Sequence, residues 1–406
     1  MHTHPEILAP AGDMTALQAA LDAGADAIYI GLDTLNMRQG ATRNFTRATL
    51  PDASIRCRER AVHLYLTLNT IIYEHEIPAC QNLLAFAKPY IDAAIVSDWA
   101  AIAACKAHHI PFHISTQMSC SNSITATFLK QQGASRIVLA RECTLEEVTQ
   151  ISHQADIPIE AFVHGAICLA VSGRCLLSHE AYGYSASRGQ CRQPCRREFF
   201  IQERREGDNA DAAFRVEPHT LLSAKDLCSL PFVDKLMHAG IAAFKIEGRA
   251  RNPEYVKTVV TAYKTAVDAV RSGTFTPQLV AQLTAACAEV YHRPFSPGLY
   301  YGRPGSDQFA DTDLNQATSR KHHVGIVLNY YQQAHIVQIQ IQGHPLAIGD
   351  NLSIHGPTTG VVEITVTNMR HDENSLNHAP KGTWVTIPCK HHVRLHDKVY
   401  IILPAT

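Results

Sequence analysis

The sequence predicts an α/β protein built on a TIM-type (β/α)8 barrel, followed by a small all-β domain. Short β-type runs alternate with longer, alanine-rich helical stretches from residue 5 to about residue 272, which is typical of repeated βα units. Eight such β-type runs can be counted, and polar residues follow each of them. The working face of a barrel lies at the carboxyl ends of its strands, so this pattern favours a barrel over a doubly wound open sheet.

The expected elements follow one another regularly. The strands are predicted at Glu6–Leu8, Ala27–Ile30, His63–Leu68, Ala93–Val96, Pro111–Ile114, Arg136–Ala140, Ile159–Val163 and Ala242–Ile246. The helices are predicted at Met14–Ala23, Asp52–Ala61, Asp98–His108, Ser123–Gln132, Leu145–His153 and Pro253–Ser272. Thr144 followed by Glu147 is a capping box, and Pro253 suits the first turn of a helix.

The seventh unit is abnormal, because about 78 residues separate Val163 from Ala242. This insertion, at about residues 164–222, contains four cysteines and a polar stretch, Gln202–Ala213. Long insertions in barrels occupy the loops over the active face. We therefore expect the cysteines to lie near the barrel mouth.

The alternation of β-type runs and helical stretches ends at about residue 272. Residues 273–303 predict a short helix and a loop that complete a barrel domain over residues 1–304, and the polar segment 305–322 predicts a linker. Residues 323–406 predict a small β-barrel domain, because β-type runs alternate there with turn residues such as Gly349-Asp350. Its strands are expected at Val324–Leu328, Ile336–Ile341, Val361–Val366, Trp384–Ile387 and Lys398–Leu403.

The composition is that of an ordinary globular protein. With 406 residues, of which 46% are hydrophobic and 18% charged, the chain can bury a large core. The start of the sequence lacks a basic segment followed by an apolar one, and no later run reaches about 18 apolar residues. We expect a cytoplasmic protein that does not bind membranes.

The net charge of −1 lacks the basic excess that nucleic-acid binders usually show, so an RNA contact would need a local basic patch. One such patch is a run of arginines within eighteen residues: Arg188, Arg192, Arg196, Arg197, Arg204 and Arg205. A solvated loop without a ligand is the alternative interpretation.

Twelve cysteines are many for a chain in a reducing compartment, where disulfides are disfavoured. Most of the eight scattered ones are predicted to be small buried hydrophobes, and this holds for Cys228 in a predicted helix. The other four, Cys168, Cys175, Cys191 and Cys195, have the spacing C-x6-C-x15-C-x3-C. Four thiolates can bind zinc or an iron–sulfur cluster, although this spacing matches neither the usual zinc pairs nor the ferredoxin patterns. A redox-active pair and unrelated buried cysteines remain as alternatives.

Two further motifs lie at strand ends. Lys245, Glu247 and Arg249 end the eighth strand, where two cations flanking a carboxylate suit an anionic ligand or an ion-pair network that closes the barrel. His113 and Gln117 end the fifth strand and could hydrogen-bond a substrate, but His113 could equally be a core histidine. His164 opens the cysteine motif and completes the set of candidate catalytic residues.

Taken together, the motifs resemble those of peptidase family U32, the collagenase-like peptidases. They are LAPAGD (Leu8–Asp13), GADAIYIG (Gly24–Gly31), HISTQ (His113–Gln117), FVHGAICLAVSGRCLLS (Phe162–Ser178), CRQPCR (Cys191–Arg196), SAKDL (Ser223–Leu227) and KIEGRAR (Lys245–Arg251). They occur in order over residues 5–272, and the C-terminal β segment is similar to that family's small C-terminal domain. Within the family, the chain is most similar to members that hydroxylate tRNA uridine.

The resemblance implies an oxygen-independent hydroxylation rather than proteolysis. Its target would be the tRNA wobble uridine, giving 5-hydroxyuridine, or else a 23S rRNA cytidine or the ubiquinone ring, with prephenate as the required metabolite. It also implies a 4Fe-4S cluster on Cys168, Cys175, Cys191 and Cys195. One branch of relatives uses a more distant cysteine, for which Cys228 is a conceivable counterpart. The stretch between Cys195 and Ser223 is shorter than in some tRNA-modifying relatives, which leaves the RNA substrate open.

The sequence offers no protease site of a known kind. It contains neither HExxH nor GxSxG, and no Cys-His dyad can be assigned. The resemblance implies a hydroxylase with tRNA and prephenate as partners, while no protein partner is indicated. A collagenase-like peptidase is the alternative activity within the family. A non-enzymatic RNA-binding factor with a structural cluster is the alternative from a different class.

Overall fold

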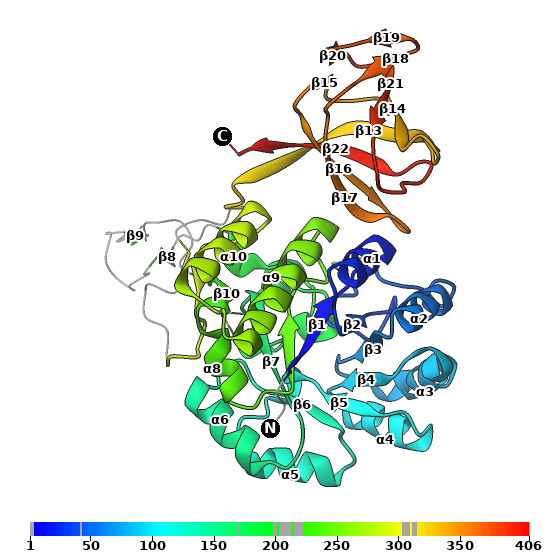
Figure 1. Ribbon diagram of the computed structural model, residues 1–406. Helices are drawn as coiled ribbons and strands as arrows, with labels where there is room; N and C mark the ends of the chain where they lie inside the picture. Colours follow the sequence, from blue (N-terminus) through cyan, green and yellow to red (C-terminus); the bar gives the residue numbers. More distant parts are fainter. Residues whose placement is uncertain are drawn as a thin grey trace.

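The computed structural model describes residues 4–40, 43–168, 170–197, 201–202, 213–214, 222–302, 309–310 and 315–405. They form a large unit of strands and helices and a smaller all-β domain packed beside it (Figure 1).

Eight parallel strands close into a barrel. They are β1 (Glu6–Pro10), β2 (Ala27–Ile30), β3 (His63–Leu68), β4 (Ala93–Val96), β5 (Phe112–Ile114), β6 (Arg136–Val138), β7 (Ile159–Ala166) and β11 (Ala243–Ile246). From β1 to β7 each strand pairs with the next one, and β11 pairs with both β7 and β1. The predicted TIM-type barrel is therefore confirmed.

Helices surround the barrel strands (Figure 1). They are α1 (Met14–Asp22), α2 (Leu50–Glu59), α3 (Ile77–Ala87), α4 (Trp99–Ala107), α5 (Ser123–Gln131), α6 (Leu145–Gln154), α8 (Val233–His238) and α9 (Pro253–Ser272). The capping box at Thr144 is present, since its side chain accepts from the amide of Glu147. Helices α3 and α8 are not among the predicted ones; α8 has only six residues, too few to show a helical period.

The insertion after β7 adds strands beside the barrel. It contains α7 (Leu177–Tyr182) and the pair β8 (Ile201–Gln202) and β9 (Ala213–Phe214), and it is followed by β10 (Asp226–Cys228), which lies antiparallel to the end of β7. The placement of Cys228 in a helix was wrong: its backbone pairs with His164 of β7, and this tertiary pairing overrides the local helical pattern. Beyond α9, α10 (Pro277–Glu289) leads to β12 (Phe295–Ser296), which pairs with β10. Arg204 and Arg205 lie outside the described residues.

The C-terminal domain is an antiparallel β structure around its own apolar core. Its longer strands are β13 (Ser319–Tyr331), β14 (Ile336–Ile341), β16 (Asn351–Gly356), β17 (Gly360–Thr365), β21 (Trp384–Pro388) and β22 (Lys398–Pro404). The first of them begins inside the segment 305–322 that was predicted as a linker, and β16 was not predicted. The sheet order runs from β17 to β19 (Asn374–Ser375), and these two edge strands do not pair with each other within residues 315–405, so the all-β class is confirmed while the hydrogen-bonded sheet is open.

Contacts between α1, α9 and β17 join this domain to the barrel, and Lys257 of α9 forms an ion pair of 3.2 Å with Glu363. None of the helices in the described ranges combines the length and the apolar character that crossing a bilayer requires.

One tyrosine ties the last barrel helix to the strand that carries the insertion. The buried Tyr263 hydroxyl of α9 donates to the carbonyl of Val163 at 2.7 Å and accepts from the amide of Ser229 at 3.0 Å. Tyr263→Phe removes both bonds, although the Ser229 amide still donates to the Val163 carbonyl at 3.0 Å. We therefore expect it to lower the free energy of unfolding by about 0.5–1.5 kcal/mol per lost bond in urea denaturation. The exposed Tyr331 is the control, where the same change should cost less than about 0.5 kcal/mol. Equal losses at the two positions would contradict this role of Tyr263.

Candidate functional site

A cavity of about 140 Å³ lies where the barrel strands end and the insertion covers them. Residues that follow β3, β5, β6 and β11 line one part of its wall, among them Asn69, Ser115, Arg141 and Arg249. Residues of the insertion line the remainder. The cavity thus occupies the face of the barrel where enzymes of this architecture carry their active sites.

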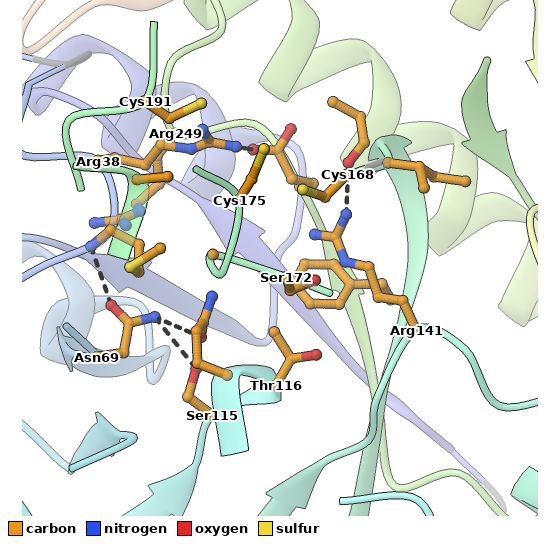
Figure 2. A pocket seen from close by; sticks show the side chains of 18 of the residues that line it. Arg38, Asn69, Ser115, Thr116, Arg141, Cys168, Ser172, Cys175, Cys191 and Arg249 are labelled. Carbon is orange, nitrogen blue, oxygen red and sulfur yellow. Dashed lines mark hydrogen bonds and ion pairs between the residues drawn. The ribbon is translucent and has the colours of Figure 1, made fainter. Parts of the chain in front are cut away.

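All four cysteines of the motif line this cavity. The other eight cysteines of the chain are buried elsewhere, and none of them belongs to the lining. Figure 2 shows Cys168, Cys175 and Cys191 on one side of the view and Asn69, Ser115 and Thr116 on the other. Burial raises the pKa of the Cys195 thiol; Arg196 opposes this, and the three other motif thiols add to it.

Local hydrogen bonds and two glycines hold the cysteine loop in place. The Ser178 hydroxyl donates to the sulfur of Cys191 at 3.8 Å and accepts from the amide of Arg192 at 2.8 Å. Gly173 and Gly189 have positive φ angles of 77° and 73°. A side chain at Gly189 would collide with the carbonyl of Asn36. The insertion can therefore approach the loop after β2 only because these positions are glycine.

The four thiols can be compared with the donor set of an iron–sulfur cluster. In the described part of the chain, no group of three or more His, Cys, Asp or Glu is arranged to hold a metal ion. The motif thiols line one shared cavity. Four cysteines from one loop are the donor set of a 4Fe-4S cluster, in which several iron atoms share the thiolates, so the residues fit such a cluster by their chemistry.

Positive charge dominates the cavity wall. Among the residues that the structure describes, its lining contains one carboxylate, Glu247, and five cations: Arg38, Arg141, Arg196, Lys245 and Arg249. Arg38 lies 2.7 Å from Glu247. Burial alone would raise the pKa of Glu247, but Arg38, Arg251 and Arg141 lower it to about 2, so this carboxylate is ionised at neutral pH.

Lys245 belongs to an ion-pair network inside the barrel as well as to the cavity. Its ammonium group lies 2.6 Å from Glu160, which is fully buried and also lies 3.5 Å from Arg136. Burial lowers the pKa of Lys245, and Glu160 opposes this shift. The network joins β11 to β7 and β6, so Lys245 has the structural role that the sequence left open as an alternative.

Arg249 and Arg141 are the cavity cations best placed to receive an anion. Arg249 is buried and donates to Asn36 at 3.0 Å and to Thr67 at 2.9 Å. Arg141 donates to the carbonyl of Ala166 at 2.6 Å and lies over the ring of Phe162. Among the residues that the structure describes, neither has a carboxylate within ion-pair distance. Burial lowers the pKa of Arg249 to about 10, and Tyr29 and Glu247 oppose this shift, so Arg249 is protonated at neutral pH without forming an ion pair within the described residues.

Two of the candidate catalytic residues lie behind the cavity wall. His113 packs its ring against the edge of Tyr65 with centroids 4.7 Å apart, and His164 lies 3.3 Å from the Tyr263 hydroxyl. Both are buried, and neither lines the cavity. Burial lowers the pKa of each to about 3. Gln117, in contrast, lines the cavity and accepts from the Asn69 amide at 3.2 Å.

The predicted RNA-binding arginines fall into two groups. Arg188 is paired with Glu76, with one contact of 2.8 Å, and Arg196 lines the cavity. Arg192 and Arg197 are exposed on the insertion. Sequence analysis did not single out Arg141, although its position directly after the sixth strand could have identified it.

Comparisons with known proteins agree with these features. The peptidase family U32 profile matches residues 12–310. The chain is 37% identical to a collagenase of Porphyromonas gingivalis over 97% of both chains. It is 32% identical to tRNA hydroxylation protein P1 of Bacillus subtilis, over 87% of this chain and 84% of the relative. It is 35% identical to 23S rRNA 5-hydroxycytidine C2501 synthase of Escherichia coli, over 65% of this chain and 39% of that protein.

The two buried histidines should make the protein less stable as the pH falls. In the unfolded chain each takes up a proton near pH 6.5, whereas in the native protein this happens only near pH 3. Between these values the unfolded state binds more protons, so the free energy of unfolding falls as the pH is lowered. We expect His164→Gln to flatten this dependence between pH 7 and pH 5, measured by urea denaturation. The exposed His153→Gln is the control, and a wild-type slope in His164→Gln would refute this interpretation.

Proposed function

This chain belongs to peptidase family U32, and from that premise we propose that it is an RNA-modifying enzyme that hydroxylates the wobble uridine of tRNA to 5-hydroxyuridine without oxygen. In this proposal the enzyme uses a 4Fe-4S cluster and takes prephenate as its co-substrate. One observation carries the proposal: four thiols share a cavity with two arginines that lack a carboxylate partner within the described residues.

The relatives favour RNA as the substrate. Two of them are named for the hydroxylation of tRNA and of ribosomal RNA, and the tRNA hydroxylation relative matches most of both chains. We place tRNA first for that reason. A ribosomal RNA cytidine and the ubiquinone ring are alternative acceptors of the same chemistry.

The cysteines would hold the cluster, which when bound would supply one-electron redox chemistry. Cys168, Cys175, Cys191 and Cys195 would each provide a thiolate. Thiolates bound to iron are not available as nucleophiles, which argues against a cysteine peptidase.

Proteolysis is the second candidate, because one relative is named a collagenase. A peptidase needs a nucleophile beside a base or a water-activating metal site. The described lining of the cavity contains no histidine or aspartate, and its glutamate is held by Arg38. These observations support hydroxylation over peptide-bond cleavage.

The cations would hold the co-substrate. Prephenate carries two carboxylates, one on its six-membered ring and one on the pyruvyl side chain, and the arginine side chain presents a planar fork that suits carboxylates. Arg249 and Arg141 would bind these carboxylates, with Lys245 adding positive charge.

The cluster ligands can be tested against a matched cysteine. We expect the protein purified without oxygen to contain about four iron and four sulfide ions per chain, and Cys168→Ser, Cys175→Ser, Cys191→Ser and Cys195→Ser to lose most of them. Cys228→Ser should keep them, because Cys228 is buried on β10 outside the cavity lining. If Cys228→Ser loses iron while Cys195→Ser retains it, the fourth ligand is Cys228 and not Cys195.

The anion site can be tested at Arg249. Arg249→Ala should weaken prephenate binding by about 10- to 100-fold in calorimetry, the range expected for lost hydrogen bonds to a charged group, and should abolish 5-hydroxyuridine formation under anaerobic conditions. Gly31→Ala should weaken binding as well, because its Cβ would collide with the Arg249 guanidinium and lie 2.8 Å from the Asn36 side chain. The exposed Arg271→Ala is the control. Unchanged hydroxylation in Arg249→Ala would refute the proposed role.

A further inference from the structure

Two exposed tyrosines of the insertion each carry an arginine on one face of the ring. Arg192 lies 4.4 Å from the ring centre of Tyr184, and Arg197 lies 5.4 Å from that of Tyr182. The tyrosines are 40% and 41% exposed, far more than a ring that serves only to pack. Neither arginine has a carboxylate within ion-pair distance in the part of the chain that the structure describes. The four residues therefore present aromatic and cationic planes to solvent, and we name them the arginine–tyrosine rim.

The rim is anchored rather than loosely attached. Tyr182 ends α7, and Gly183 turns the chain before Tyr184 with a φ of 71°, a conformation that glycine adopts without strain. Arg188, in the same loop, donates a hydrogen bond of 2.8 Å to the Glu76 carboxylate. Arg188 is thus occupied within the protein, which leaves the rim arginines as the exposed ones among those predicted to bind RNA within the described residues.

The rim adjoins the cluster motif directly. Ser178 of α7 donates to the sulfur of Cys191 and accepts from the amide of Arg192. Cys191 lines the cavity, and the next residue along the chain belongs to the rim. A polymer whose reacting unit enters the cavity would therefore place its neighbouring units on these four side chains.

We propose that the arginine–tyrosine rim binds the unpaired nucleotides that flank the target base. Every nucleobase has a π face that stacks on an aromatic ring or a guanidinium plane, while arginine also neutralises the phosphates. In a duplex the bases are already stacked between their neighbours, so this surface selects single-stranded or loop RNA. The inference rests on the proposed RNA-modifying function and adds to it the surface and the type of RNA that it recognises.

Stacking and charge can be separated by the choice of variant. The probe is a fluorescein-labelled single-stranded oligouridylate, compared with an RNA duplex of equal length, and its dissociation constant is measured by fluorescence anisotropy with the holoprotein. Tyr184→Leu and Tyr182→Leu should each raise the Kd for the single strand by about 5- to 150-fold, the range for loss of one base–aromatic stack. Tyr184→Phe and Tyr182→Phe keep the ring and should stay within about twofold of the wild type, as should Tyr331→Leu on the C-terminal domain.

Arg192→Gln should weaken binding of the single strand and lower its salt dependence by about one phosphate contact. Iron content, measured on every variant, identifies any that has lost its fold. The proposal is overturned if the leucine variants bind the single strand as the wild type does, or if the duplex binds as tightly as the single strand. If RNA binding depends on the rim residues but the wild-type protein forms no hydroxylated product, the proposed function is refuted while the role of the rim in RNA binding stands.

Discussion

The pairing of β11 with both β7 and β1 is the constraint on which the site depends. It closes the barrel, and it places the residues that follow β11 beside the end of β7, from which the insertion departs. The buried ion pair between Lys245 and Glu160 joins the same two strands from inside. As a result, two segments that are distant in the sequence, the cysteine loop and the KIEGR motif, line one cavity.

The excess of positive charge in that cavity destabilises the folded protein, and the proposed ligands would offset it. A buried guanidinium without a counter-ion destabilises a protein, yet Arg249 has no carboxylate within reach in the described residues and keeps its proton. Two ligands would offset this charge: an anionic cluster on the thiolates and a dicarboxylate at the arginines. The same excess of cations extends outward to Arg192 and Arg197, beside Cys191. In the proposed function, the cluster, the co-substrate and the RNA phosphates would therefore share one electrostatic reason for binding at this end of the barrel.

The barrel could be predicted because its signals are local. Short apolar runs between helical stretches predict β2, β3 and β4 with the same first and last residues as in the structure. The capping box predicts the start of α6. Features decided by tertiary contacts could not be predicted. Cys228 is a strand residue because β7 pairs with it. His113 is buried against Tyr65 and His164 against Tyr263, and neither lines the cavity. Spacing alone could group the four cysteines. It could not identify the partners of Arg188 or the tyrosines that lie under Arg192 and Arg197.

The central claim is that this protein hydroxylates tRNA uridine without oxygen. The most direct measurement is nucleoside mass spectrometry of tRNA from cells that lack the protein and grow anaerobically, so that an oxygen-dependent route cannot mask the loss. We predict that 5-hydroxyuridine and its derivatives disappear and return when the wild-type protein is restored. Unchanged levels of 5-hydroxyuridine would contradict the claim and direct attention to ribosomal RNA and quinones as substrates.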